Sequence, residues 1–160
     1  MNRMGLQQEV QTLRLVPMFS HLDPARLKLI SFASERVHIM QGEEFIREGE
    51  EGEDAFVLLS GRAEVTLEGG ETQVKLGEVE QNQIVGMIAL LAHGRRTATV
   101  RALEPMECLR LPKDVFHQMV RDLPDFALAV MRDLSDALER QTAHFREVLG
   151  DQAADRDAKH

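Results

Sequence analysis

The chain of 160 residues contains no tryptophan and no tyrosine, and it has a single cysteine, Cys108. Without Trp or Tyr it lacks the usual side chains for stacking on bases or sugars. One cysteine can form no disulfide within the chain and provides no set of thiolate ligands for a metal. No run of 18 apolar residues is present, so we expect no membrane-spanning helix, and no apolar leader opens the sequence.

Basic residues are also too few to dominate the surface charge. Lys and Arg number 19 against 27 Asp and Glu, which gives a net charge of −8. Binding to nucleic acid or to an anionic membrane surface requires clustered Lys and Arg that neutralise phosphates. The charge balance therefore argues against both partners, and we expect a cytoplasmic protein of about one domain.

Two periodicities divide the chain. Apolar residues at helical spacing predict helices over 6–16 and 24–34, with Asp23 as the N-cap and Pro24 at the first position of the second helix. From 36 to 112, short apolar runs alternate with polar residues, and glycines interrupt them about every 8–12 residues, which is typical of an all-β sandwich or barrel.

Glycine and proline indicate where these strands turn. Gly69-Gly70 predicts a two-residue hairpin turn between strands 63–68 and 71–76. Two further strands are expected over 97–103 and 107–111, and Glu104-Pro105 separates them.

One apolar segment inside the β region has a different character. Residues 86–92 (Gly-Met-Ile-Ala-Leu-Leu-Ala) favour a short helix between two strands. The first backbone N–H groups of a helix lack partners inside the helix, and with the helix dipole they attract an anion. Arg96 follows at the start of the next strand, where its guanidinium could hold a phosphate at two points, and Thr97 adds a hydroxyl. The pattern predicts a cradle for a small phosphorylated ligand; the alternative is an ordinary turn followed by a solvated Arg95-Arg96 pair.

These motifs resemble those of the cyclic-nucleotide-binding domains of the catabolite-activator, or Crp/Fnr, type, over residues 15–138. Residues 42–61 carry the glycine frame of that family, and 86–91 followed by 96–100 carry its phosphate-binding cassette. The resemblance implies a mainly β fold with flanking helices: an eight-stranded β-roll, or double-stranded jelly roll, with N-terminal helices and a long C-terminal helix. It places one such domain over 1–150, with the β-roll at 36–112.

The resemblance also assigns roles to individual residues. Arg96 would pair with the cyclic phosphate of cyclic AMP or cyclic GMP, and the next residue, Thr97, would contact it with a hydroxyl, which some members link to tolerance for guanine. Gly86 would open the cassette helix, and the backbone N–H groups of Ile88 and Ala89 would cap the phosphate. The nucleotide would pack against two β-roll positions, Val65 and Leu76, and the segment 127–145 would cover its base.

Two positions depart from the family pattern. The glutamate that usually follows the cassette glycine, and accepts a hydrogen bond from the ribose 2′-hydroxyl, is Met87 here, and a thioether accepts almost nothing. The proline that usually precedes the arginine is Arg95. Three interpretations stay open: a weak or altered cyclic-nucleotide site, a site for another small anion, and a degenerate domain that binds no nucleotide and serves protein interaction or dimerisation. None is an enzyme, and none needs an obligatory cofactor or a metal.

The C-terminal part is again helical. Helices are expected over 113–120 and 124–149, with Gly150 as the C-cap and a frayed polar tail over 151–160. The long helix carries a heptad seam that predicts a homodimer through 127–148, the alternative being a helix that packs on its own β-roll. The seam residues are Ala127, Met131, Leu134, Leu138, Gln141, Phe145 and Val148.

The remaining candidates carry little chemistry. The transcription factors of this family continue into a helix-turn-helix, for which 151–160 is too short, so we expect no direct DNA binding. We expect signalling through a protein partner, which the sequence does not identify. The acidic run 48–54 lacks the ligand spacing of a calcium loop and is interpreted as a solvated turn. His93 is interpreted as a solvated loop histidine and Cys108 as a small buried apolar residue.

Overall fold

The computed structural model describes residues 5–92 and 94–158. His93 and the last two residues of the predicted tail lie outside these ranges. The chain forms two compact units, residues 1–127 and 128–160. The first unit holds the N-terminal helices and every strand, and the second consists of most of the final helix.

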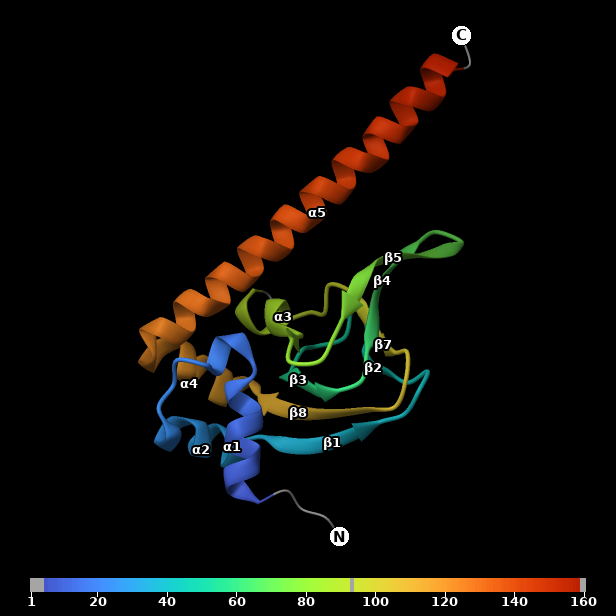
Figure 1. The fold of residues 1–160 in the computed structure, drawn as a ribbon. Helices are drawn as coiled ribbons and strands as arrows, with labels where there is room; N and C mark the ends of the chain where they lie inside the picture. The colour runs from blue at the N-terminus through green and yellow to red at the C-terminus, as the bar shows by residue number, and fades with distance from the viewer. Residues whose placement is uncertain (1–4, 93, 159–160) are drawn as a thin grey trace. The chain divides into compact units, whose positions relative to one another are not determined.

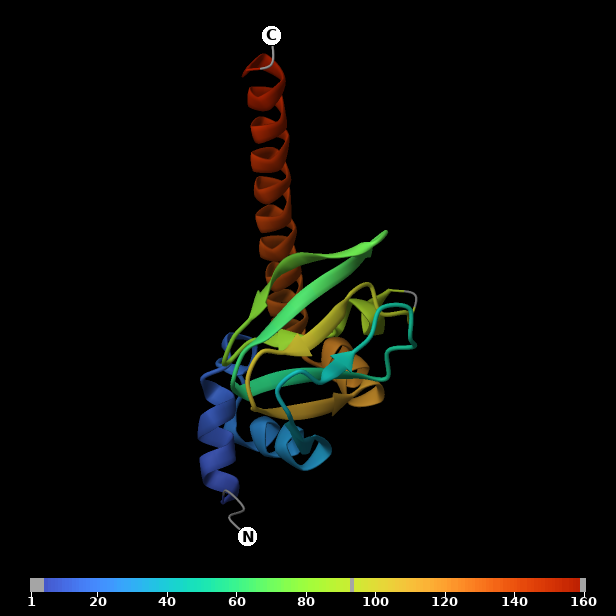
Figure 2. The same cartoon turned by 90° about the vertical axis from the view of Figure 1, so that its right-hand side faces the viewer.

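Three short helical elements open the first unit: α1 (Leu6–Arg14), the 3-10 helix η1 (Pro17–Phe19) and α2 (Pro24–Ala33). Figure 2 shows α1 and α2 beside each other. The predicted N-cap of α2 is confirmed, because an Asp23 oxygen accepts a hydrogen bond from the backbone N–H of Arg26 at 2.9 Å. The first helix ends two residues earlier than predicted, since the chain tightens into η1 at Pro17.

Eight strands form two four-stranded antiparallel sheets, and this confirms the predicted β-roll (Figure 1). One sheet has the order β1-β8-β3-β6 and the other the order β2-β7-β4-β5. The strands are β1 (Glu35–Ile39), β2 (Glu44–Ile46), β3 (Asp54–Ser60), β4 (Ala63–Gly69), β5 (Thr72–Val79), β6 (Ile84–Val85), β7 (Thr99–Ala102) and β8 (Met106–Pro112).

The hydrophobic core lies between the two sheets. Both sheets contribute to one cluster of buried apolar side chains, including Leu58 and Cys108 from one sheet and Val100 from the other. Strand β3 is buried over five consecutive residues, 55–59. In a strand with one solvated face, buried and exposed residues alternate instead. Both faces of β3 are covered, because the helices α3 (Met87–Leu91) and α4 (Lys113–Asp122) contact it in addition to the opposite sheet.

The β4–β5 hairpin turns one residue later than predicted. Gly69 pairs with Thr72, so the two-residue loop is Gly70-Glu71 rather than Gly69-Gly70. Gly70 has φ +79°, a conformation that a side chain would strain, whereas Gly69 remains in the ladder. Figure 1 shows this hairpin in green, extending beyond the neighbouring strands.

The C-terminal helix is longer than predicted. Helix α5 spans Pro124–Ala158, so Gly150 lies inside it and is not a C-cap, and residues 151–158 are helical rather than a frayed tail. A helix-ending glycine usually adopts a positive φ, and Gly150 is not among the glycines that do. The residues after it include several good helix formers such as Ala and Gln, which let the helix continue through one glycine.

Within the described ranges, no helix combines the length and the apolar character that a bilayer span requires.

Candidate functional site

The predicted cassette helix is present as α3, and Gly86 precedes it. Gly86 has φ +95°, and a Cβ atom there would lie 2.8 Å from Nη1 of Arg96 and 3.3 Å from the backbone oxygen of Asp54. Only glycine satisfies both the backbone conformation and this close approach. The structure therefore brings Gly86 and Arg96 together, as the sequence predicted from their spacing.

The first turn of α3 consists of Met87, Ile88 and Ala89. No carbonyl oxygen within the helix can accept a hydrogen bond from their backbone N–H groups, because these groups belong to its first turn. Met87 and Ala89 are buried, at 4% and 3% exposure, whereas the Ile88 side chain is 47% exposed. Met87 is thus a core side chain here, and it leaves the position after the cassette glycine without a carboxylate.

Arg96 has a buried guanidinium, with the residue 7% exposed. Nη1 donates to the Gly86 oxygen at 3.0 Å, and Nη2 donates to the backbone oxygen and to Oδ1 of Asp54 at 2.7 and 2.9 Å. The interpretation of Arg96 as part of a solvated pair is wrong, although its neighbour Arg95 is exposed. Among the described residues, Nη1 and Nη2 make the hydrogen bonds of this side chain.

Asp54 is the functional candidate that sequence reasoning missed. The acidic run 48–54 was interpreted as a solvated turn, but its last member is ion-paired with Arg96 and lies 3.7 Å from Nε of Arg110. The Asp54 side chain is only 22% exposed. No spacing rule connects residue 54 with residue 96. A signal does exist in the topology, because Asp54 is the first residue of β3 and follows a glycine-rich turn.

Burial weakens both charges of this ion pair. It raises the pKa of Asp54, and the neighbouring Arg96 and Arg110 lower that pKa by less. It also lowers the pKa of Arg96, and Asp54 offsets only part of this change. Both pKa shifts disfavour the charged forms. This occurs in a buried ion pair when the attraction between the two charges is weaker than the hydration that each charge has lost. An additional anion beside Arg96 would supply part of the missing stabilisation but would be repelled by Asp54.

The backbone around Arg96 is held by the turn between β2 and β3. Arg96 N–H donates to the Glu50 oxygen at 2.8 Å, and the Arg96 oxygen accepts from Gly49 N–H at 2.9 Å. Gly52 N–H donates to the Gly94 oxygen at 2.6 Å. A Cβ atom on Gly52 would lie only 3.3 Å from Cζ of Arg96, so this turn approaches the guanidinium closely.

Thr97 is exposed at the edge of this arrangement. The threonine hydroxyl that is bonded into the turn belongs to Thr99, whose Oγ1 accepts from Glu48 N–H at 3.0 Å. Thr99 is buried, and its hydroxyl satisfies the backbone of the turn. Thr97 is thus an exposed residue next to Arg96 in sequence, and its contact with a phosphate stays a prediction.

The two β-roll positions, Val65 and Leu76, lie on paired strands and are half-buried. Val65 pairs with Gly77 and Thr66 pairs with Lys75, so Leu76 is the extra residue of a β-bulge. A bulge redirects the side chain of the extra residue and increases the local twist. Val65 packs against the core cluster, which leaves only part of its side chain for contact with a ligand. Coverage of a base by 127–145 stays a prediction.

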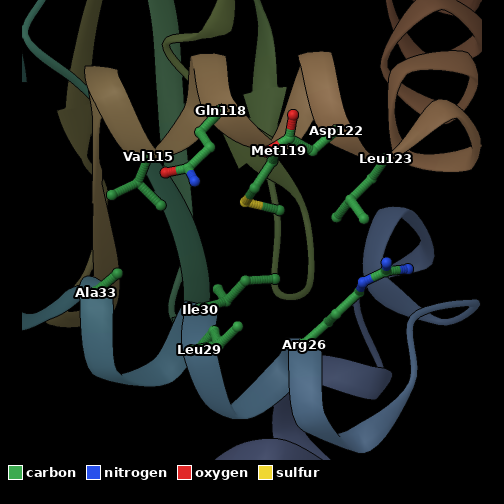
Figure 3. A pocket seen from close by; sticks show the side chains of 9 residues that line it. All are labelled: Arg26, Leu29, Ile30, Ala33, Val115, Gln118, Met119, Asp122 and Leu123. Atoms are coloured by element: carbon green, nitrogen blue, oxygen red, sulfur yellow. The ribbon is translucent and has the colours of Figure 1, made fainter.

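A hollow of about 380 Å³ lies elsewhere in the first unit, between α2 and α4 (Figure 3). Its buried surface comes from Ile30, Met119 and Leu123, and Arg26 and Asp122 lie at one end. No cassette residue lines it. Sequence reasoning had no means to predict this hollow, because it forms between two helices about 90 residues apart. Among the described residues, no group of three or more His, Cys, Asp and Glu side chains could hold a metal ion.

Two sheets that enclose an apolar core, a short glycine-initiated helix and a buried arginine beside that helix define a β-roll domain. Residues 36–122 match the cyclic nucleotide-binding domain family, which is more than half of the chain. The chain belongs to this family.

The proteins that the chain resembles include much longer chains and an isolated domain of similar size. The chain is 27% identical over 142 residues to lysophospholipase nte1 of Aspergillus oryzae, which covers 84% of this chain and 9% of that protein. It is 33% identical over 112 residues to the cAMP-dependent protein kinase regulatory subunit of Blastocladiella emersonii, covering 69% of this chain and 28% of that protein. The sensor domain of the transcriptional regulator DNR from Pseudomonas aeruginosa has a similar fold, with TM-score 0.75, 21% identity, and coverage of 86% and 93%. The chain thus spans only about a tenth of the length of the lysophospholipases that it matches.

Proposed function

We propose that this domain binds a cyclic nucleotide and holds its phosphate at Arg96 and the first turn of α3. The observation that carries the proposal is the buried guanidinium of Arg96, 3.0 Å from the backbone oxygen of Gly86 at the start of α3. A guanidinium and a row of backbone N–H groups are the two donor sets that proteins use for phosphate. Membership of the family and the cAMP-dependent relative support a cyclic nucleotide as the phosphate carrier.

Binding is expected to be weak. Met87 supplies no acceptor for a ribose 2′-hydroxyl, and loss of one hydrogen bond to a charged group costs about 1.5–3 kcal/mol, or about 10- to 150-fold in affinity. Asp54 also holds Nη2 of Arg96, so a phosphate has to bind next to a carboxylate. The exposed Arg95 adds a second cation that offsets part of this repulsion.

Calorimetric titration with cyclic AMP and cyclic GMP tests the proposal. Arg96→Lys keeps a positive charge but removes the planar donor set, and it should abolish binding, whereas the matched control Arg95→Lys should change affinity little. Adenosine and inorganic phosphate, titrated separately, distinguish a cyclic-nucleotide site from a site for another small anion. Equal affinities in the two lysine variants would contradict the proposal.

The second candidate is an interaction module that binds no nucleotide. The Arg96–Asp54 ion pair favours it, because the guanidinium already has an anionic partner within the chain. A thermal melt separates the two candidates: at 100 times the dissociation constant, a ligand stabilises its protein by about 2.7 kcal/mol. No shift of the wild-type melting temperature at millimolar cyclic AMP or cyclic GMP would favour the interaction module.

We also propose that the domain is regulatory rather than catalytic, and that α5 carries the signal as part of a homodimer over 127–148. Exposed apolar side chains repeat along this helix, with Met131 at 61%, Leu138 at 65% and Phe145 at 64% exposure. Their spacing of seven residues forms one side of a coiled-coil seam, and burial of such a seam is what stabilises a long helix.

Sedimentation at micromolar concentration tests the dimer. Leu138→Asp places a charge in the seam and should dissociate it. Ala143→Asp places the same charge on the opposite side of the helix and should leave it intact. A monomeric wild-type chain would exclude this mode of signalling.

A further inference from the structure

His117 connects α4 to the cassette helix. Its Nε2 atom lies 2.6 Å from the backbone oxygen of Leu90 in α3, and the side chain is half-buried. A carbonyl oxygen only accepts, so Nε2 carries a proton and donates it to this bond. The last carbonyls of a helix have no donor within the helix. The imidazole therefore satisfies the end of α3 that lies opposite Gly86.

A second contact ties α4 to the surroundings of Arg96. The N–H of Lys113, the first residue of α4, donates to the Glu53 oxygen at 2.9 Å. Glu53 directly precedes Asp54, which is the partner of Arg96. Helix α4 is thus bonded at its start to the turn that holds Arg96, and one turn later to the helix that follows Gly86.

Phe116, next to His117 in α4, belongs to a cluster of buried aromatic rings. Phe116 is fully buried, and its ring meets that of Phe126 edge to face at 5.9 Å. Phe126, in the first turn of α5, stacks on Phe19 at 5.8 Å. A displacement of α4 therefore has to be accommodated by this cluster as well as by α3, since well-packed interiors do not deform continuously.

We propose that His117 is a positioning residue for ligand capture: its Nε2–H bond to Leu90 holds α3 in the conformation that presents its first turn, and couples the position of α4 to occupancy of the Arg96 site. The inference rests on the proposed cyclic-nucleotide function. When α3 is already ordered, binding does not have to order this helix, so the entropic cost is smaller and the affinity for the ligand is higher. Because coupling is reciprocal, a ligand that stabilises α3 also stabilises the α4 position bonded to it.

Two substitutions separate the hydrogen bond from the bulk of the side chain. His117→Gln keeps an amide N–H donor at a reach similar to that of Nε2, whereas His117→Leu keeps volume without a donor. In calorimetric titration with cyclic AMP, His117→Leu should weaken binding about fivefold, the equivalent of one neutral hydrogen bond, and His117→Gln should restore it. If His117→Leu fails to fold, His117→Asn, whose amide is too short to reach Leu90, takes its place with the same expectation.

Amide hydrogen exchange without ligand provides the second measurement. Residues of α3 should exchange faster in His117→Leu than in the wild type or in His117→Gln, while α1 and α2 should not change. Equal cyclic AMP affinities in the wild type and His117→Leu, or unchanged α3 exchange, would overturn the role of His117. If α3 exchanges faster in His117→Leu while the wild type binds neither cyclic AMP nor cyclic GMP, the result would instead overturn the proposed function.

Discussion

Met87 decides what the candidate site can distinguish in a sugar. A carboxylate at this position accepts a hydrogen bond from the ribose 2′-hydroxyl in the resembled domains, and a thioether does not. The structure places Met87 in the core at 4% exposure, with a buried alanine two residues later. The proposed cyclic-nucleotide site would therefore recognise the phosphate and would not sense the 2′-hydroxyl.

The first prediction follows from this loss. Wild-type protein should bind cyclic AMP and its 2′-deoxy analogue with affinities equal within about twofold, because no acceptor next to Gly86 senses the hydroxyl. Met87→Glu should prefer the ribose form by about tenfold, the effect of one hydrogen bond to a charged group. Competition titration of the two nucleotides measures the ratio. A wild-type preference for the ribose form as large as that of the variant would show that another residue reads the 2′-hydroxyl.

The second prediction concerns Asp54 and pH. Burial raises the folded-state pKa of Asp54 above its ordinary value of 3.8, so the folded chain binds more protons than the unfolded chain just above that pH. The contribution of Asp54 to stability therefore falls as pH rises through this window. Asp54→Asn removes this dependence while keeping an acceptor oxygen for Arg96.

Urea unfolding of the wild type and Asp54→Asn, at steps from pH 4 to pH 7, measures the difference. The variant should gain stability relative to the wild type as pH rises, because it lacks the protons that the folded wild type holds at Asp54. A constant difference between Asp54→Asn and the wild type would contradict the direction given for the pKa.

At the scale of elements, local signals predicted most of what the structure shows. Asp23 and Pro24 fix the start of α2, and the apolar run after Gly86 predicts α3, because caps and glycine conformations act over a few residues. The same locality explains two errors. Gly69-Gly70 offers two positions for one turn, and the register with β5 selects the second. Gly150 is an equally good signal for a helix end and for a tolerated helix interior.

The third prediction tests the position of Gly150 within α5. Gly in an exposed helix interior is about 0.5–1 kcal/mol less stable than Ala, whereas Ala at a left-handed C-cap would be strained. Gly150→Ala should therefore raise helicity, measured by circular dichroism at 222 nm, and raise the midpoint of helix melting. A fall in helicity would mean that the helix ends at Gly150.

At the scale of the whole molecule, the sequence predicted the architecture and the approach of Arg96 to Gly86, but not the other contacts that hold the site together. The glycine frame and the cassette were sufficient for the β-roll, because each is a contiguous motif. The Arg96–Asp54 pair joins residues 42 positions apart and the His117–Leu90 pair residues 27 apart. Such contacts depend on the crossing of strands and helices, which spacing along the chain does not encode.

The fourth prediction uses Cys108 as a probe of global opening. Cys108 is fully buried between the sheets, and burial raises the pKa of its thiol to about 12. At pH 8 the thiolate is then only about one part in ten thousand, so iodoacetamide should leave the native chain unmodified. Mass spectrometry should show complete modification in denaturant. Rapid modification of the native chain would place Cys108 at an opening of the β-roll.

Arg96 has a structural role that does not depend on a ligand. Its backbone bonds fasten the turn between β2 and β3, and its side chain fastens the start of β3 to the residue before α3. A single residue thereby joins three stretches of chain through hydrogen bonds. In a lineage that had given up nucleotide capture, selection for a foldable β-roll would still preserve this arginine. Its presence in a related chain is then a mark of shared architecture, and competence to bind has to be judged from its neighbours.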